Sequence, residues 1–284
     1  MRMQTSTLSE FIARYRRLFV LTGAGCSTDS GIPDYRDASG GWKRPPPVSF
    51  QAFMGSAAAR QRYWARSFAG WPRLRRARPN AAHGALARLE QQGRVQLLVT
   101  QNVDGLHQAA GSVQVLDLHG RVDRVRCTAC HDHVAREELQ AELLRRNPAW
   151  RGLQAQAGPD GDADLEGLPF GSFAVPSCAR CGGVLKPDVV FFGESVPRPR
   201  VDAAMRGLEQ ADAVLVVGSS LMVYSGYRFV QAAAQAGKPV AAVNLGRTRA
   251  DELLTLKVSQ PCAAALAALQ TAADAQPPAA HCEV

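Results

Sequence analysis

Six short apolar runs, most of them followed by polar or glycine-rich residues, restrict what this chain can fold into more than any other feature. The runs span residues 18–22, 95–99, 113–118, 188–192, 213–217 and 240–243. Each has the length of one buried strand. Helical patterns lie between several of them, at residues 81–92 (with Asn80 as the N-cap), 198–209 and 227–236. This alternation predicts an α/β fold in which helices cover both faces of a parallel sheet.

Ligands of parallel sheets bind at the carboxyl ends of the strands. Five of the runs are followed by polar or glycine-rich residues: GAGCS at 23–27, QNVD at 101–104, HG at 119–120, GSS at 218–220 and NLG at 244–246. We therefore expect a ligand site at this edge of the sheet. The glycines of the first turn allow a backbone to approach a pyrophosphate. The third glycine of the full dinucleotide motif is absent, so a tight turn without a ligand explains this motif equally well by itself.

Side chains at these strand ends carry reactive or hydrogen-bonding groups. His119 has the side chain most often used as a general base, although a structural histidine is an equally good interpretation. Gln101, Asn102 and Asp104 could hold a ribose or a carboxamide, or could cap the strand end. The segment 30–37, SGIPDYRD, combines a turn, a carboxylate, an aromatic ring and a guanidinium, which suits a loop that folds over a nucleotide.

Two Cys-x2-Cys pairs, Cys127/Cys130 and Cys178/Cys181, are separated by 47 residues. Four thiolates complete the tetrahedral shell of one Zn²⁺ and leave no open position, so the pattern predicts a structural zinc site. The spacer is longer than in a simple zinc ribbon, and two disulfides or a redox pair are the alternatives. His131 and His133 could compete as ligands.

The formal net charge of +8 is concentrated in one segment. No acidic residue lies between Asp37 and Glu90, and ten basic residues do. They are Lys43, Arg44, Arg60, Arg62, Arg66, Arg73, Arg75, Arg76, Arg78 and Arg88. The remaining 23 basic and 25 acidic residues give −2, so the chain is not a general polycation. A local anion site, an acidic partner face and a solvated surface all remain open.

The 284 residues, of which 46% are hydrophobic and 20% charged, suit one large or two small globular domains. The sequence has no apolar run of the roughly 18 residues that span a bilayer and no secretory signal, so we predict a cytoplasmic protein without a membrane partner. We expect segment 158–171, rich in Gly, Asp and Pro, to be a mobile loop. We expect the Ala- and Pro-rich C-terminal tail to be loose.

Taken together, these motifs resemble the sirtuin family of NAD-dependent protein lysine deacylases. The similarity covers roughly residues 10–265. It rests on GAGCSTDSGIPDYRD at 23–37, TQNVDGLH at 100–107, LHG at 118–120, the cysteine quartet, KPDVVFFGE at 186–194, GSSL at 218–221 and VNLG at 243–246. The forms PDYR, RYWAR, VVFFGE and VYSGYRF are most similar to class II sirtuins. Tyr35 stands where many relatives have Phe.

The resemblance implies a Rossmann-like NAD-binding domain built from residues 1–37, 80–120 and 186–265. It implies a small domain built from a helical module at 38–79 and a zinc-ribbon-like module at 121–185, with a loose tail at 266–284. It also implies that NAD and one structural Zn²⁺ are the cofactors. Acylated-lysine proteins would be the partners, with no specific nucleic acid, and a monomer is favoured.

The resemblance assigns roles by position. His119 would be the proton acceptor for the ribose diol, with Gln101 and Asn102 beside it, and the products would be free lysine, nicotinamide and O-acyl-ADP-ribose. The residues expected to contact NAD are Gly23, Ala24, Gly25, Cys26, Ser27, Asp34, Tyr35, Arg36, Gln101, Asn102, Val103, Asp104, Gly218, Ser219, Ser220, Asn244, Leu245, Gly246 and Cys262. Those expected along the acyl-lysine peptide are Val189, Phe191, Gly193 and Glu194.

Tyr63 and Arg66 resemble the pair with which desuccinylating sirtuins hold a carboxylate, which implies an acidic acyl group; the alternative is a surface helix face. Protein ADP-ribosylation and lipoamide cleavage are alternative activities of the same scaffold. A zinc-containing nucleic-acid binder would explain the basic segment but not the polar strand ends. A dehydrogenase would use the glycine-rich turn alone.

Overall fold

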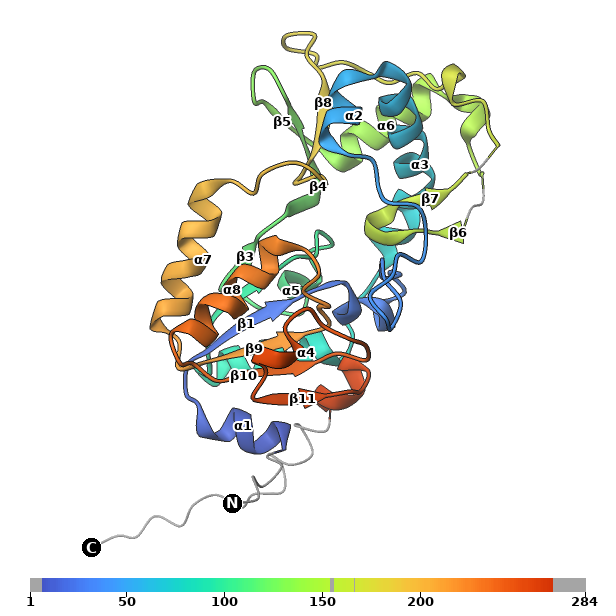
Figure 1. The fold of residues 1–284 in the computed structure, drawn as a ribbon. Helices are drawn as coiled ribbons and strands as arrows, with labels where there is room; N and C mark the ends of the chain where they lie inside the picture. The colour runs from blue at the N-terminus through green and yellow to red at the C-terminus, as the bar shows by residue number, and fades with distance from the viewer. Residues whose placement is uncertain (1–6, 154–155, 166, 268–284) are drawn as a thin grey trace, which may run out of the picture.

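A six-stranded parallel sheet forms the centre of the larger lobe (Figure 1). The computed structural model describes residues 7–153, 156–165 and 167–267. The strand order is β11-β10-β9-β1-β2-β3. The strands are β1 Leu18–Thr22, β2 Val95–Thr100, β3 Val115–Asp117, β9 Ala213–Val217, β10 Val240–Val243 and β11 Leu256–Val258. The prediction of a parallel α/β sheet is confirmed.

Alternate side chains of the central strands enter two different cores. Leu18 and Val20 of β1 pack with helices α1 and α4 on one face, whereas Phe19 and Leu21 pack with α7 and α8 on the other. The helices are α1 Leu8–Arg14, α4 Ala81–Gln91, α5 Leu106–Ala109, α7 Arg198–Gln210 and α8 Tyr224–Gln235. Because β1 is covered on both faces, all five of its residues are apolar or, at Thr22, internally hydrogen-bonded.

The starts of three helices differ in how well the sequence predicted them. The Asn80 side chain accepts a hydrogen bond from the Ala82 N–H at 2.9 Å, which confirms the predicted cap of α4. Helix α1 was not predicted, although the capping box formed by Thr7 and Glu10 marks its start. Helix α8 begins at Tyr224, three residues before the predicted start.

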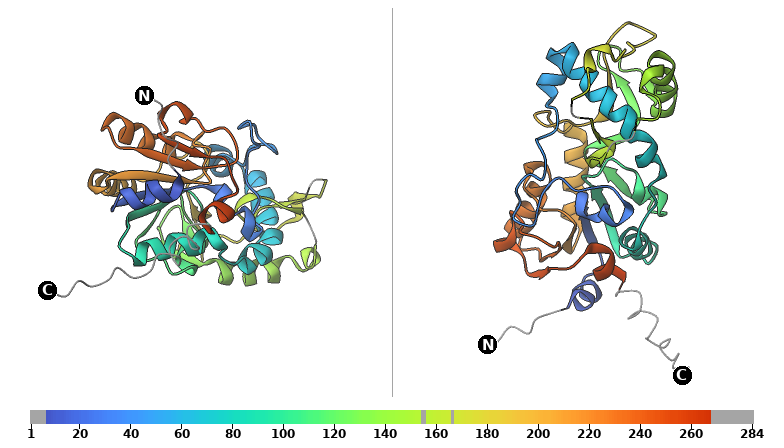
Figure 2. Two further views of the ribbon diagram at one scale, coloured as in Figure 1. Left: turned by 90° about the horizontal axis from the view of Figure 1, so that it is seen from below. Right: turned by 90° about the vertical axis from the view of Figure 1, so that its right-hand side faces the viewer.

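A second, smaller lobe sits above the parallel sheet (Figures 1 and 2). Its antiparallel sheet has the order β5-β4-β8, from β4 Gly120–Cys127, β5 His133–Ala135 and β8 Leu185–Val189. Helices α2 Phe50–Gly55, α3 Ala57–Arg76 and α6 Arg136–Arg146 pack against it. This lobe has its own core, with Trp64 and Phe173 fully buried.

The predicted strand at residues 188–192 is wrong in both position and sheet. The strand is β8, and it pairs antiparallel with β4, so Asp188 lies opposite Arg121. Apolar composition alone does not distinguish a parallel from an antiparallel partner, and here the partner is the strand that leads into the first cysteine pair. The run at 113–118 also shortens to β3, since Val113 is 86% exposed.

The segment expected to be a mobile loop contains regular pieces that pack on α3. Strand β7 Ala163–Asp164 pairs with β6 Gln156–Ala157, and η4 Pro159–Gly161 precedes it. A Cβ atom added to Gly70 of α3 would lie 2.1 Å from the Gly161 carbonyl oxygen. Only glycine at position 70 therefore permits this close contact between the helix and the segment.

The C-terminal part of the described chain and the lengths of the helices test two further predictions. Residues 262–267 are helical and Leu266 is fully buried, so the predicted loose tail does not begin at residue 266; residues 268–284 lie outside the described part. Among the described residues, every helix is too short or too polar to cross a bilayer.

Candidate active site and metal centre

A cavity of about 890 Å³ lies at the carboxyl edge of the parallel sheet. All five polar strand ends contribute to it, as the sequence predicted. From these motifs its wall contains Ala24, Gly25, Gln101, Asn102, Val103, His119, Gly218, Ser219, Ser220, Asn244, Leu245 and Gly246. Cys262 from the later segment also lines it. The cavity has the size and the mixed polar and apolar wall of a small-molecule or cofactor site.

His119 is held in one orientation by two hydrogen bonds. Its Nδ1–H donates to the Gln101 carbonyl oxygen at 3.0 Å; since a carbonyl only accepts, the proton sits on Nδ1. The bare Nε2 accepts from the Ser225 hydroxyl at 2.9 Å. Burial lowers the pKa of His119 to about 4, with smaller contributions from Arg200 and Arg228. The ring is therefore neutral at physiological pH, with the lone pair on Nε2.

Ser225 is a contact that sequence reasoning missed. It lies in the first turn of α8, which was predicted to start later, and 106 positions separate it from His119. The signal available was its place just after the GSS motif, at the start of a helix that faces the cavity. Trp42, Phe192, Met222 and Arg228 also line the cavity and were not predicted.

A buried polar network supports the glycine-rich turn from below. Asn102 Nδ2 donates to the Gly23 carbonyl and to the Ser27 hydroxyl oxygen, both at 3.0 Å. The Ser27 hydroxyl donates to Asp104 at 2.7 Å. Burial raises the pKa of Asp104, partly offset by hydrogen bonds from the Leu106 N–H and Ser27. Of these, only Asn102 lines the cavity, so the network shapes the turn from behind.

Two strand-end turns are packed against each other at the centre of the cavity edge. Gly218 has φ +66°, and a Cβ on it would lie 2.2 Å from the Cys26 nitrogen. The Ser219 hydroxyl donates to Gln101 Oε1 at 2.6 Å, which joins the β9 end to the β2 end. Cys26 itself was predicted at the ligand, but its side chain belongs to the core and does not line the cavity.

The loop after the glycine-rich turn is tied by charge and by aromatic contacts. Asp34 pairs with Lys43 at 2.5 Å. Arg36 donates to the Gly40 carbonyl at 2.7 Å and its guanidinium lies 4.0 Å from the centre of the Trp42 ring. Tyr35 packs edge-on against Trp42, with the ring centres 6.1 Å apart. All three predicted loop residues, Asp34, Tyr35 and Arg36, line the cavity.

The residues predicted along the peptide also line this cavity: Val189, Phe191, Gly193 and Glu194. The Glu194 carboxylate accepts from the Phe191 N–H at 2.8 Å and from Lys186 Nζ at 3.0 Å. Glu194 is thus engaged by its own chain and holds the turn that follows β8.

A second cavity of about 630 Å³ adjoins the first, and Val189 and Phe191 line both. Tyr63 and Arg66 of α3 line the second one, so Arg66 does not lie on an open helix face. The Arg66 guanidinium binds Asp162 through two contacts, Nε to Oδ1 at 3.0 Å and an Nη to Oδ2 at 2.8 Å. The carboxylate that Arg66 holds here therefore comes from the protein itself.

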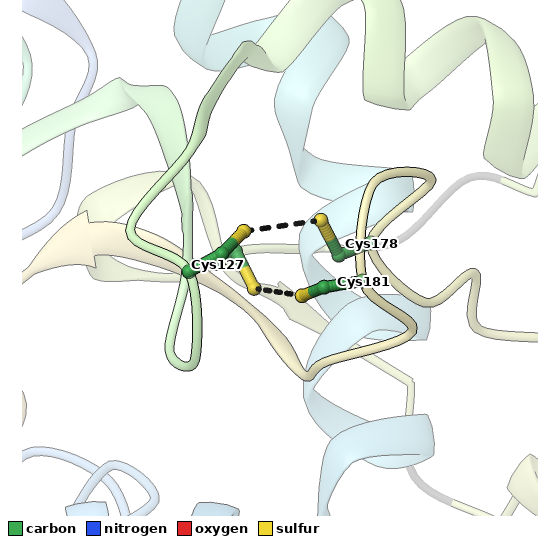
Figure 3. Close-up of side chains that lie close together, drawn as sticks. Cys127, Cys178 and Cys181 are labelled. Carbon is green, nitrogen blue, oxygen red and sulfur yellow. Dashed lines mark hydrogen bonds between the residues drawn. The ribbon is translucent and has the colours of Figure 1, made fainter.

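The four predicted cysteines come together in the second lobe, and Figure 3 labels three of them, Cys127, Cys178 and Cys181. Their sulfur atoms lie within 4.8 Å of one another, with Cys127 to Cys181 at 3.5 Å and Cys130 to Cys178 at 3.7 Å. These separations exceed a disulfide bond. They suit four sulfur ligands about 2.3 Å from a central Zn²⁺. His131 and His133 do not belong to the group.

Together the fold and the site define a class: an α/β protein whose strand ends share one cavity with a partly buried, neutral histidine, beside a tetracysteine module. A family model described as "Sir2 family" matches residues 23–225. The chain belongs to this family, the sirtuins.

Individual relatives and a solved structure support this family membership. An NAD-dependent protein deacetylase of Xanthomonas campestris pv. campestris (strain 8004) is 67% identical over 271 residues, which cover 95% of this chain and 91% of the relative. The NAD-dependent protein deacylase Sirt4 of Drosophila melanogaster is 46% identical over 258 residues, covering 90% and 83%. A solved structure described as "Sir2-p53 peptide-NAD+" has a TM-score of 0.74 and 28% identity, covering 94% of this chain and 97% of that chain.

Proposed function

We propose that this chain is an NAD-dependent protein lysine deacylase with His119 as its proton acceptor. The observation that carries the proposal is the partly buried, neutral imidazole with its lone pair on Nε2, at the edge where all five strand-end motifs meet. Family membership and relatives named deacetylase and deacylase support the activity. When bound, NAD supplies an ADP-ribosyl group that accepts the acyl group as nicotinamide is released.

Different strand ends would bind different parts of NAD. Ala24 and Gly25 of the glycine-rich turn line the part of the cavity where a pyrophosphate would fit, and the Gly25 N–H holds the turn by donating to the Gly218 carbonyl oxygen at 2.8 Å. Gln101 and Asn102 present amides near His119, and the neighbouring ends of β9 and β10 line the other part of the cavity. His119 would take a proton from a ribose hydroxyl at Nε2, while Gln101 keeps Nδ1 protonated and the ring fixed.

The cysteine quartet would hold one Zn²⁺ that closes the second lobe and makes no contact with the reacting atoms, because four thiolates leave no open position. The acyl-lysine peptide would add as an extended strand next to residues 189–194. We further propose that class II membership, the monomeric state and the cytoplasmic location hold for this chain. The predicted domain boundaries are also proposed to hold, except that β8 extends the second lobe to Val189 and that the helical residues 262–267 continue past the predicted start of the tail.

The activity should fall with acid only well below neutral pH. His119 accepts a proton only when neutral, and burial lowers its pKa to about 4. We expect kcat/KM for an acetyl-lysine peptide to stay level from pH 7 toward pH 5 and then to decline with a midpoint below the ordinary histidine value of about 6.5. Arg200→Gln removes a positive charge that lowers this pKa and should move the midpoint upward. A midpoint near 6.5 in the wild type would contradict a desolvated base.

Acyl selectivity should depend on the pair formed by Arg66 and Asp162. An acidic acyl chain must compete with Asp162 for the guanidinium. We expect Asp162→Asn to raise kcat/KM for succinyl- and glutaryl-lysine peptides about tenfold relative to acetyl-lysine, equal to about 1.4 kcal/mol. Arg66→Met should abolish that gain.

A matched control for Asp162→Asn removes a different ion pair of helix α3. Glu137→Gln frees Arg75, which lies on the same helix α3 but in an exposed pair away from the cavity, and should leave the acyl preference unchanged. Unchanged selectivity in Asp162→Asn would overturn this account of the second cavity.

Mass spectrometry of the products separates the proposed reaction from its alternatives. Incubation with NAD and a panel of acetyl-, succinyl-, glutaryl- and lipoyl-lysine peptides should release nicotinamide and O-acyl-ADP-ribose in equal amounts. Transfer of ADP-ribose to protein without loss of the acyl group would identify an ADP-ribosyltransferase instead. Formation of NADH would indicate a dehydrogenase and would sink the proposal.

A further inference from the structure

Three buried side chains meet behind the glycine-rich turn, outside both cavities. They are Cys26 in η1 Ala24–Cys26, His83 in α4 and His107 in α5. One ligand atom from each lies within 4.8 Å of the other two, and the residues are only 1%, 0% and 1% exposed, respectively. The two imidazole ring centres are 4.8 Å apart. The deacylase mechanism uses none of these side chains.

Two nitrogen atoms in this cluster lack a partner. Among the described residues, neither Nε2 of His83 nor Nδ1 of His107 has a hydrogen-bond partner. The opposite ring atoms are occupied: His107 Nε2 faces the Thr22 hydroxyl at 2.8 Å, and His83 Nδ1 accepts from the Asn80 N–H at 3.3 Å. A buried polar atom without a partner is unfavourable, because it has lost its hydrogen bond to water and gained none in the protein. Two of them beside a thiol therefore point to a ligand that completes the cluster.

We propose that Cys26, His83 and His107 form a buried binding site for one monovalent soft metal ion, with Cu(I) as the biological example. A thiolate and two imidazoles are the ligands that soft transition metals favour. Thr22 would accept a hydrogen bond from His107 Nε2–H and so leave Nδ1 free for the ion, as the supporting groups of metal-binding histidines do.

The proton balance of binding is simple. The ion replaces the proton of the Cys26 thiol, which leaves to solvent, and no oxidation state changes. Without the ion, His83 Nδ1 accepts from the Asn80 N–H, so the proton of His83 is on Nε2. For Nε2 to bind the ion, this proton must move to Nδ1, which can then no longer accept from Asn80. This sacrifices one long hydrogen bond, a loss that three metal–ligand bonds outweigh.

Charge and ligand number favour a monovalent ion over Zn²⁺. Exchanging a proton for Cu(I) leaves the charge of the buried cluster unchanged, whereas a divalent ion adds one positive charge, at a cost of several kcal/mol when unpaired. The cluster also has three members among the described residues, and structural zinc takes four ligands. The cysteine quartet meets that zinc requirement, and this cluster does not.

The test uses the full chain with the cysteine quartet loaded with zinc, titrated anaerobically with Cu(I) against the chelator bathocuproine disulfonate. We expect the wild type to retain one equivalent of Cu(I) that Cys26→Ser and His107→Gln do not. Cys262→Ser is the matched control, because Cys262 is also buried but is not part of the cluster, and it should retain the equivalent. Equal retention by all four proteins would overturn the proposal.

X-ray absorption on the copper-loaded wild type needs no variant and so does not depend on how the variants fold. We expect one sulfur and two imidazole nitrogens around the copper. A shell of sulfur alone would place the ion at the cysteine quartet and refute the site. Displacement of the copper by equimolar Zn²⁺ would equally refute a site selective for monovalent ions.

Discussion

Replacing His119 by tyrosine should abolish deacylation while the protein still folds and binds zinc. A positioned general base accelerates proton transfer by about 10²- to 10⁴-fold. A phenol with a pKa near 10 does not take up this proton at neutral pH. We therefore expect kcat for an acetyl-lysine peptide to fall by at least about 10²-fold. Nicotinamide release should be measured in parallel, since the proton transfer assigned to His119 is a separate step from the loss of nicotinamide.

Two further variants make this result specific. His119→Gln is smaller than tyrosine and should lose comparable activity, which separates loss of the base from obstruction of the cavity. Ser225→Ala keeps the imidazole and removes only the hydroxyl that donates to Nε2, so a smaller loss is expected. Full activity in His119→Tyr, with circular dichroism and zinc content unchanged, would refute the base assignment.

Removing one thiolate from the cysteine quartet should have the largest effect on stability. Cys127 ends β4, and its sulfur lies 3.5 Å from that of Cys181, so Cys127→Ser leaves three ligands around the metal. Binding of a structural zinc contributes on the order of 10 kcal/mol to folding. We expect metal analysis to show loss of about one zinc ion per chain. We expect thermal unfolding to begin in the second lobe, because β4 of its antiparallel sheet ends at Cys127 of the quartet.

The control lies in the same turn. His131 follows the first cysteine pair and precedes β5, and its φ is +62°. Asparagine tolerates this backbone conformation, so His131→Asn should not disturb the turn. This variant should keep its zinc and its unfolding temperature. Retention of stoichiometric zinc by Cys127→Ser would show that the quartet is not the metal site.

The sequence predicted the parts of the site that are local in the chain. Apolar runs ending in glycine and amide residues predicted β1, β2, β9 and β10 and their shared edge, because strand burial and turn chemistry depend on neighbouring residues. The doubled cysteine pairs predicted a group that the structure brings together. The motif at 119–120 predicted His119 at the same edge, although β3 ends two residues earlier.

What the sequence did not predict depends on contacts between distant residues. Nothing near Arg66 indicates that Asp162, 96 positions later, occupies its guanidinium. The apolar pattern of β8 does not identify its partner strand. The partner is β4, which ends at Cys127 opposite Leu185. Cys26 lies in the glycine-rich turn whose neighbours Ala24 and Gly25 line the cavity, yet its side chain enters the core, next to His83 and His107. Motif membership locates a residue in the chain but not the direction of its side chain.

The contact between Gly70 and Gly161 has a consequence for protein engineering. Two insertions that are remote in the chain, the helical one carrying Gly70 and Arg66 and the cysteine-rich one carrying Gly161 and Asp162, fit each other in shape and in charge. A chimaera that replaces only one of them would set a side chain against a carbonyl wherever the new segment lacks Gly70, and would leave a guanidinium without its carboxylate wherever it lacks Asp162. Transfer of acyl preference between sirtuins should therefore succeed only when both insertions are exchanged as a single cassette.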